Sequence, residues 1–244
     1  MPKGPGTLKR AGAPSAAARI RRRIERGGER FWRVSDFNDL PPRTVARTLA
    51  RLAEAGVVER ARHGLYYRSR PTVVGPSIPS ATAVASHMID APLHAAGLSA
   101  ANVLGLTTQN PARQELATPA ANPPSVLSNA IVHTRRPASR AHLSAAEGAL
   151  IEMLRTRGRY SDVGPAGTIR RLLLILGTGG TFERVARSAL DEPPRVRAML
   201  GALGEELEAN PRTLKRLRDS LNPLSTFDFG LLGDLPAAEK WQAR

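Results

Sequence analysis

Apolar residues recur at helical spacing between Pro41 and Gly56, and this segment carries the clearest hydrophobic pattern in the chain. Proline at positions 41 and 42 favours a helix start, because its ring fixes φ near the helical value. Gly56 follows the last periodic residue and favours a helix stop. The buried stripe is predicted at the i, i+4, i+7 and i+8 positions Val45, Leu49, Leu52 and Ala53.

A β-hairpin is predicted directly after this helix. Val57 and Val58 open one strand, and residues 65–67, Leu-Tyr-Tyr, form the returning strand. Between them, Arg62-His63-Gly64 has the composition of a tight turn. We assign Tyr66 and Tyr67 to the core of this small domain rather than to a ligand.

Three shorter elements are predicted before Pro41. Ser15 caps a helix over residues 15–26, with Ile20 and Ile24 facing inward and two glycines at its end. Residues 31–34 form a short strand, and residues 35–38 begin a second, short helix. The order of helix, strand, helix, helix, strand, turn and strand is that of a winged helix-turn-helix.

The pattern changes after residue 70. Residues 71–85 are rich in proline, serine and threonine and lose the helical period, which predicts a linker. A helix capped by Ser99 and two short strands, 114–118 and 130–134, are expected next. The remaining pattern is helical, with starts marked by Ser144, Thr168, Thr181, Pro194 and Pro211 and predicted ranges 144–157, 169–176, 182–190, 195–207 and 211–221.

These elements predict an α+β, mostly helical chain with two folded domains. A disordered basic leader (1–14) precedes the winged helix-turn-helix domain (15–70). After the linker (71–85), residues 86–244 form a larger α-rich domain with a few short strands.

Positive charge is concentrated in the first third of the chain. The sequence has 36 Lys+Arg against 21 Asp+Glu, a formal net charge of +15. Residues 1–70 hold 17 basic and 6 acidic residues, a net charge of +11, which leaves +4 for the other 174 residues. Such a field favours a polyanion near the N-terminus, where phosphate contacts give salt-dependent affinity.

The polar face of the helix that starts at Pro42 carries side chains suited to reading a major groove. Arginine donates bidentate hydrogen bonds to guanine, and threonine contacts phosphate or the thymine methyl group. In the hairpin, a guanidinium can enter the minor groove or hold the backbone. The alternative is that these are solvated charges on an amphipathic helix. The candidate DNA-binding residues are Arg43, Thr44, Arg47, Thr48 and Arg51 on the helix and Arg60, Arg62 and His63 in the hairpin.

The sequence offers no candidate catalytic, metal or cofactor site. It contains no cysteine, which excludes thiolate sites and suits a reducing cytoplasm. Its five histidines lack HExxH spacing, and the glycine-rich residues 177–180 lack the Lys-Ser/Thr of a phosphate loop. No apolar run reaches the roughly 18 residues of a membrane helix, and residues 1–14 lack the apolar middle of a signal peptide. We therefore expect a cytoplasmic protein that is not an enzyme.

Several segments together resemble one bacterial family, the AbiEi-type antitoxins of type IV toxin–antitoxin systems. The similarity covers most of residues 16–241, and the segments are LARLAEAGVVERARHGLYY (49–67), LSAANVLGLTTQNP (98–111), ELATP (115–119), IVHTRRP (131–137) and SLNPLSTFDFG (220–230). The resemblance implies that the winged domain binds an inverted-repeat operator in its own promoter, as a homodimer on DNA. It also implies that the C-terminal domain neutralises a cognate nucleotidyltransferase toxin.

The terminal motif supplies the candidate partner-binding residues, Asn222, Phe227, Asp228 and Phe229. The alternative is a strap that docks Phe227 and Phe229 onto the helical core. The chain is not itself the toxin, since it contains no Gly-Ser dipeptide of the kind that a nucleotidyltransferase needs beside its metal-binding acids. Two other functions remain open: a stand-alone winged-helix regulator with a helical oligomerisation or effector domain, and a non-catalytic protein-interaction adaptor.

Overall fold

The computed structural model describes residues 14–122 and 130–244, so the predicted leader lies outside the described residues except for Pro14. The chain divides into two compact units, residues 1–80 and 81–244. Each unit has its own hydrophobic core. Helices outweigh strands throughout, and the fold is a mostly helical α+β fold.

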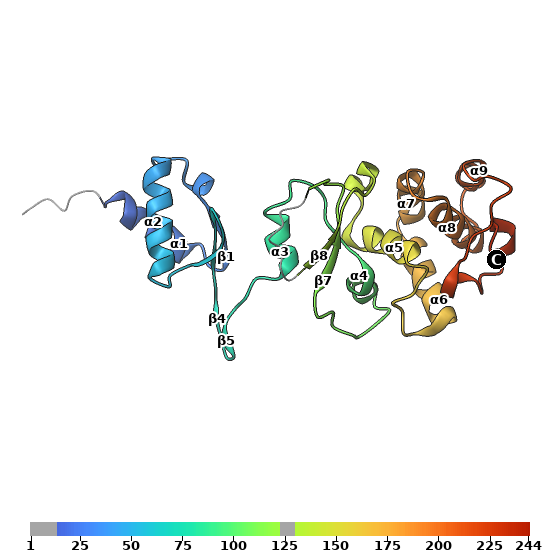
Figure 1. Ribbon diagram of the computed structural model, residues 1–244, viewed down its shortest axis with the longest axis horizontal. Coiled ribbons are helices and arrows are strands. Elements are labelled where there is room, and N and C mark those ends of the chain that lie inside the picture. The colour runs from blue at the N-terminus through green and yellow to red at the C-terminus, as the bar shows by residue number, and fades with distance from the viewer. Residues whose placement is uncertain (1–13, 123–129) are drawn as a thin grey trace, which may run out of the picture. The chain divides into compact units, whose positions relative to one another are not determined.

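From residue 14 onward, the N-terminal unit combines two α-helices with a small antiparallel sheet (Figure 1). Its strand order is β1-β3-β2, with Trp32 of β1 opposite Tyr66 of β3. In chain order the elements are α1 (Ala16–Arg26), β1 (Arg30–Arg33), the 3-10 helix η1 (Val34–Phe37), α2 (Pro42–Glu54), β2 (Glu59–Arg62), β3 (Leu65–Arg68), β4 (Pro71–Thr72) and β5 (Gly75–Pro76).

Local sequence signals explain the two helices of this unit. The Ser15 hydroxyl accepts a hydrogen bond from the Ala18 N–H, which caps α1 as predicted. Ile20 and Ile24 are fully buried against the α2 stripe of Val45, Leu49 and Leu52. The predicted second helix is shorter than expected, because η1 forms a single 3-10 turn before Leu40 and the prolines redirect the chain.

A hairpin occupies part of the predicted linker. β4 and β5 pair with Val73 and Val74 at their tip, and both valines are almost fully exposed. The Arg70 N–H donates to the Ser77 hydroxyl at 2.8 Å and closes the base of the hairpin. The same hydroxyl lies 3.2 Å from the Tyr67 hydroxyl of β3, which ties the hairpin to the sheet. The linker prediction missed this pairing, since a two-residue strand has no detectable period.

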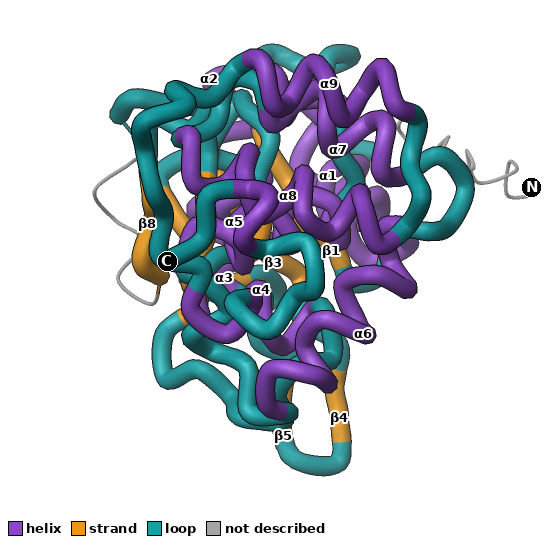
Figure 2. Tube along the Cα trace, turned by 90° about the vertical axis from the view of Figure 1, so that its right-hand side faces the viewer, coloured by secondary structure: helices purple, strands orange, loops and turns teal. Residues whose placement is uncertain are grey.

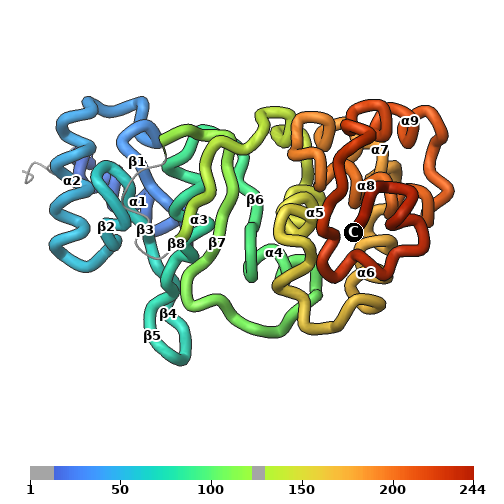
Figure 3. The backbone as a smooth tube through the Cα atoms, turned by 45° about the vertical axis from the view of Figure 1, so that its right-hand side comes forward, coloured from blue at the N-terminus to red at the C-terminus, as the bar shows by residue number. Residues whose placement is uncertain are grey.

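The C-terminal unit begins with a small mixed sheet. Strands β7 and β8 run parallel and adjacent, and β6 pairs antiparallel with β7 (Figure 3). Helix α4 packs against β7 and α5. The elements are α3 (Ala81–Ser86), β6 (His94–Ala95), α4 (Gly97–Val103), β7 (Gln114–Ala117), β8 (Ala130–His133) and the 3-10 helix η2 (Ala138–His142).

The rest of this unit is a helical bundle. Helices α7, α8 and α9 are neighbours (Figure 2), and α8 also packs on α5 and α6. Trp241, fully buried at the C-terminal end, packs against Gly201 of α8. The elements are α5 (Ala145–Arg155), α6 (Gly164–Leu176), α7 (Thr181–Ala189), α8 (Pro194–Glu206), α9 (Pro211–Asp219), η3 (Gly230–Leu232) and η4 (Glu239–Trp241). No helix in the described residues is long and apolar enough to cross a bilayer.

Cap predictions in this unit have mixed outcomes. Ser144 and Glu147 form the predicted capping box of α5. Ser99 does not cap α4, because the helix begins at Gly97 and the Ser99 hydroxyl accepts from the Glu115 N–H of β7 instead. Thr168 likewise lies inside α6, where its hydroxyl donates to the Gly164 carbonyl. Both hydroxyls therefore form hydrogen bonds with other backbone groups and do not cap the helix starts that the sequence predicted for them.

A buried ion network joins η2, α5 and the turn before α8. Arg140, which is fully buried, donates to Glu152 at 2.5 Å and to Glu192 at 2.6 Å. Arg136 forms a bidentate pair with Glu152 at 2.7 and 3.0 Å, and Arg155 donates to Glu192 at 2.7 Å. Burial by itself raises the pKa of Glu152, but the hydrogen bonds and charges of Arg136 and Arg140 outweigh it and hold the pKa below the ordinary value of 4.5.

Acid should therefore weaken the fold through Glu152. A carboxyl whose pKa is lower in the folded chain adds stability above its unfolded pKa and loses that stability as pH falls through the folded value. The free energy of unfolding should change little from pH 7 to about 5.5 and fall below about pH 4.5. The urea concentration at the midpoint of unfolding, measured across this pH range, tests the prediction. The Glu152→Gln variant should have a lower free energy of unfolding at pH 7 and should lose less of it as the pH falls. Parallel curves for the variant and the wild type would contradict the assignment of this pH dependence to Glu152.

Candidate nucleic-acid interface

The exposed face of α2 presents a row of arginines with no intramolecular partner. Arg43, Arg47 and Arg51 lie four residues apart, so successive turns place them on the same side of the helix. All three are exposed, as is Thr44. None of the three forms a hydrogen bond or ion pair with another described residue, so their donors are free for a ligand.

Thr48 does not lie on the exposed face of α2, where the sequence predicted a DNA-binding residue. Its exposed fraction is 9%, because it lies three residues after Val45 and four before Leu52 and therefore at the edge of the buried stripe. A helical stripe has i+3 as well as i+4 members, and the prediction used only the larger apolar side chains to define it. Thr48 supports α2 in the core rather than facing a ligand.

The β2–β3 hairpin places the remaining candidates beside the end of this helix. The two-residue turn is His63-Gly64, and Gly64 adopts a φ of +73°, which favours glycine. An Arg60 Nη2 lies 3.1 Å from the His63 Nδ1, so these two side chains lie together. Arg62 is half-buried and has no hydrogen-bond partner among the described residues.

Backbone hydrogen bonds fix the hairpin to α2. The Val57 and Val58 N–H groups donate to the Leu52 carbonyl at 2.9 and 3.4 Å. Val58 and Tyr66 also share one core cluster with Leu49. The arginine row of α2 and the hairpin are therefore parts of one rigid body. Tyr66 and Tyr67 are both buried, in agreement with their assignment to the core.

The C-terminal motif packs onto its own unit. Phe229 is 1% exposed, so the prediction that it contacts a partner is wrong. Phe227 is partly buried, and its N–H donates to the Gln242 carbonyl at 2.7 Å. Asp228 pairs with Arg157 and accepts from the Gly230 N–H, while the Asn222 side chain accepts from the Leu224 N–H. These contacts make residues 222–229 a strap, the alternative that the sequence left open.

Leu224 is an exposed apolar residue that sequence reasoning missed. It is 92% exposed within a segment whose aromatic side chains turn inward. The phenylalanines drew attention because aromatic residues dominate interfaces. The signal for Leu224 is its place directly after Pro223, because these two residues form a turn and both are exposed.

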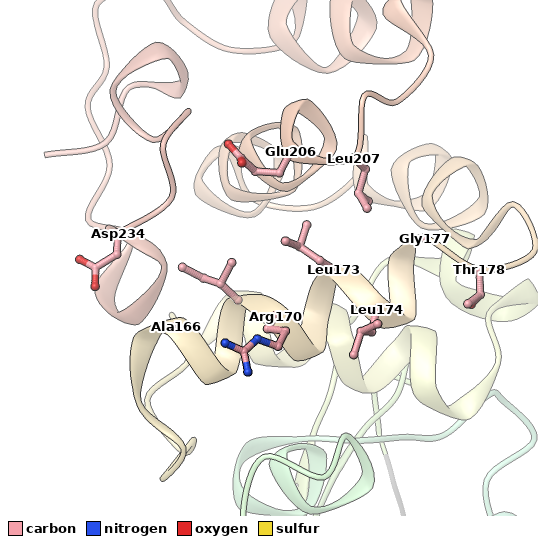
Figure 4. Close-up of a pocket in the computed structure, with 10 residues that line it drawn as sticks. Ala166, Arg170, Leu173, Leu174, Gly177, Thr178, Glu206, Leu207 and Asp234 are labelled. Atoms are coloured by element: carbon pink, nitrogen blue, oxygen red, sulfur yellow. The ribbon is translucent and has the colours of Figure 1, made fainter.

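An apolar groove of about 740 Å³ lies on the C-terminal unit. In Figure 4, Leu173 of α6 points toward α8 and Leu207 lies across from it at the end of α8. Arg170, Glu206 and Asp234 supply charged groups around this apolar surface. A mainly apolar hollow with a few charged groups suits a small ligand.

Comparisons with known proteins bear on the fold. No protein-family model matches the chain. No curated protein matches its sequence. Among solved structures it is similar to the crystal structure of the Rv2827c protein from Mycobacterium tuberculosis, with 18% identity and a TM-score of 0.55. That match covers 95% of this chain and 92% of the other. At this identity the likeness shows a shared fold alone.

Proposed function

We propose that residues 15–70 form a winged helix-turn-helix that binds double-stranded DNA by sequence, and that the chain represses its own promoter as the antitoxin of a toxin–antitoxin operon. In this proposal α2 enters the major groove and the β2–β3 hairpin is the wing. The element order of the N-terminal unit supports it.

One observation carries the DNA-binding part. Arg43, Arg47 and Arg51 extend from one exposed face, and no described acid neutralises them. On α1, by contrast, three of the five arginines have carboxylate partners, namely Arg19, Arg21 and Arg23. Unpaired guanidinium groups retain all five donors for guanine edges and phosphates.

Arg47→Ala should weaken binding to the cognate promoter by about 1 to 3 kcal/mol and relax base preference at one position. The reason is the loss of a bidentate base contact from the middle of the row. Titration of a promoter fragment and a scrambled duplex at two salt concentrations measures it. Equal losses of affinity on both duplexes would show that Arg47 does not contribute to base recognition.

Arg62→Ala is the matched control for that measurement. Arg62 lies in the hairpin and has no described hydrogen-bond or ion-pair partner, so its removal breaks no polar contact within the chain. If it holds the phosphate backbone, all duplexes weaken alike and the slope of log K against log salt flattens by about one unit. The intact chain should prefer its own promoter over random DNA by about 10³ or more. The absence of any preference would favour the adaptor alternative.

The antitoxin part rests on the family resemblance and is tested separately. A neighbouring reading frame with a Gly-Ser turn and two spaced acids would be the cognate nucleotidyltransferase toxin. Coexpression of this chain should restore growth that the toxin alone arrests. On an inverted-repeat operator, light scattering should show two copies of the chain per duplex.

A second candidate function is a stand-alone regulator with an effector domain. The apolar groove beside Leu173 and Leu207 favours it, because such a hollow suits a small ligand. The absence of any toxin-like neighbour, together with a ligand that changes promoter affinity, would support this reading over the antitoxin.

A further inference from the structure

A cavity of about 580 Å³ on the N-terminal unit is lined mainly by arginine. Four of these arginines lie at i, i+3, i+4 and i+7 on α1, a spacing that places them on one helix face. The fifth comes from the first residue of β1. The five side chains are Arg19, Arg22, Arg23, Arg26 and Arg30.

Internal acids neutralise only part of this charge. Asp36 is the acid in the described lining, and it lies 3.7 Å from Arg30. Asp39, just outside, pairs with Arg19 at 2.7 Å and with Arg23 at 2.9 Å. The hydrogen bond from Arg23 holds the pKa of Asp39 below its usual value, so the carboxylate stays charged. Five positive charges against two negative charges leave a net charge of +3 around one hollow.

Arg22 and Arg26 account for two of these three excess charges, and the third arises because Arg19 and Arg23 share Asp39. Arg22 and Arg26 are both exposed, and neither has a hydrogen bond or ion pair with another described residue. Their neighbour Arg21 pairs with Glu25 at 2.8 Å and does not line the cavity. Like charges held close together repel, and a bound anion removes that repulsion.

Trp32 lines the same cavity and has an unused donor. Its exposed fraction is 2%, and its indole Nε1–H has no acceptor among the described residues. The Arg30 guanidinium lies over its ring, 4.0 Å from the centroid. Trp32 is therefore a spectroscopic reporter of whatever occupies the cavity.

We propose that this arginine cavity, formed by α1 and the start of β1, binds phosphate groups. Arginine suits phosphate because its planar fork donates two parallel hydrogen bonds to neighbouring oxygens. The phosphates come either from a nucleic-acid backbone or from a free phosphate compound, and the two sources share this chemistry. The site is distinct from the α2 face and does not require α2 to read bases.

Pyrophosphate titration of the full chain, followed by tryptophan fluorescence, tests the site directly. We expect saturable binding that changes Trp32 emission, with buried Trp241 as a constant background. Arg22→Ala combined with Arg26→Ala should raise the dissociation constant at least tenfold, because it removes the two unpaired donors. Arg21→Ala is the control on the same helix, and it should leave binding unchanged.

Salt dependence on a random duplex then identifies the source of the phosphate. If the cavity holds backbone phosphates, the double variant should flatten the slope of log K against log salt by about two units, and pyrophosphate should compete with the duplex. If it holds a free phosphate compound, the slope should stay unchanged while pyrophosphate binding is lost.

Pyrophosphate binding equal in the wild type and the double variant, with no change of salt slope, would overturn the proposal. An effect of Arg21→Ala as large as that of the double variant would do the same. Failure of the proposed function is distinguishable, because it appears as loss of promoter preference and of the Arg47→Ala effect. The pyrophosphate measurement does not depend on either.

Discussion

Glu192→Gln should lower the free energy of unfolding by about 3 to 5 kcal/mol, because it leaves buried charge without a partner. Glu192 accepts from Arg140 at 2.6 Å and from Arg155 at 2.7 Å, and its side chain is fully buried. Glutamine keeps the shape but removes the negative charge and turns an N–H donor toward a guanidinium. Glu152 alone would then face three arginines.

Chemical denaturation at pH 7 measures this loss, with Asp219→Asn as the control. Asp219 forms an ion pair with Lys215 in which both side chains are largely exposed, so its removal should change stability little. Similar midpoints for Glu192→Gln and the wild type would mean that water enters the network and screens it. The Arg140 Nη2 atom, already without an acceptor among the described residues, marks where such water would bind.

Gly148→Ala is expected to cost about 3 kcal/mol, at the upper end of the range for overpacked cores. Gly148 lies inside α5, and a Cβ there would be 2.0 Å from the His94 Nδ1 atom. His94 cannot move away easily, since it is 4% exposed and its Nε2 lies 3.2 Å from the Arg140 carbonyl. Burial lowers the pKa of His94, so the ring packs in its neutral form.

A double-mutant cycle separates this clash from any backbone effect. Gly148→Ala in a His94→Ala background should cost less than about 1 kcal/mol, because the ring that blocks the methyl group is gone. Gly167→Ala in α6 is the control, since its Cβ would meet the side chain of half-exposed Val163 at 3.1 Å. It should be neutral or slightly stabilising through helix propensity. Additive costs at positions 94 and 148 would show that the two residues do not conflict.

Local signals were enough for elements whose ends are set by neighbouring residues. The Ser15 cap, the capping box of Ser144 and Glu147, and the Pro42 start of α2 were all predicted, and the structure places helices there. Such caps act within one helical turn, so their partners are visible in sequence. The start of α6 was missed by five residues, because Gly164 and Pro165 resemble a loop until the helix packs on its neighbours.

The candidate site was predictable only in part. The exposed row of Arg43, Arg47 and Arg51 follows from helical spacing alone. The arginine stripe of α1 was also visible, but its convergence with Arg30 and Trp32 depends on how the chain turns after Gly27. The burial of Phe229 depends likewise on contacts with distant residues. Neither the convergence of these arginines nor the burial of Phe229 has a local signal in the sequence.

Sequence by itself determined the helical periods, the caps at Ser15 and Ser144, the position of the turn before Leu65 and the concentration of positive charge before residue 71. Tertiary structure alone decided which arginines are paired, because an ion pair depends on distance in space. Arg140 meets Glu192 across 52 positions of the chain, whereas Arg22 and Arg26 meet no described acid although Glu25 lies between them. A guanidinium is free for phosphate or DNA only where folding brings no carboxylate to it.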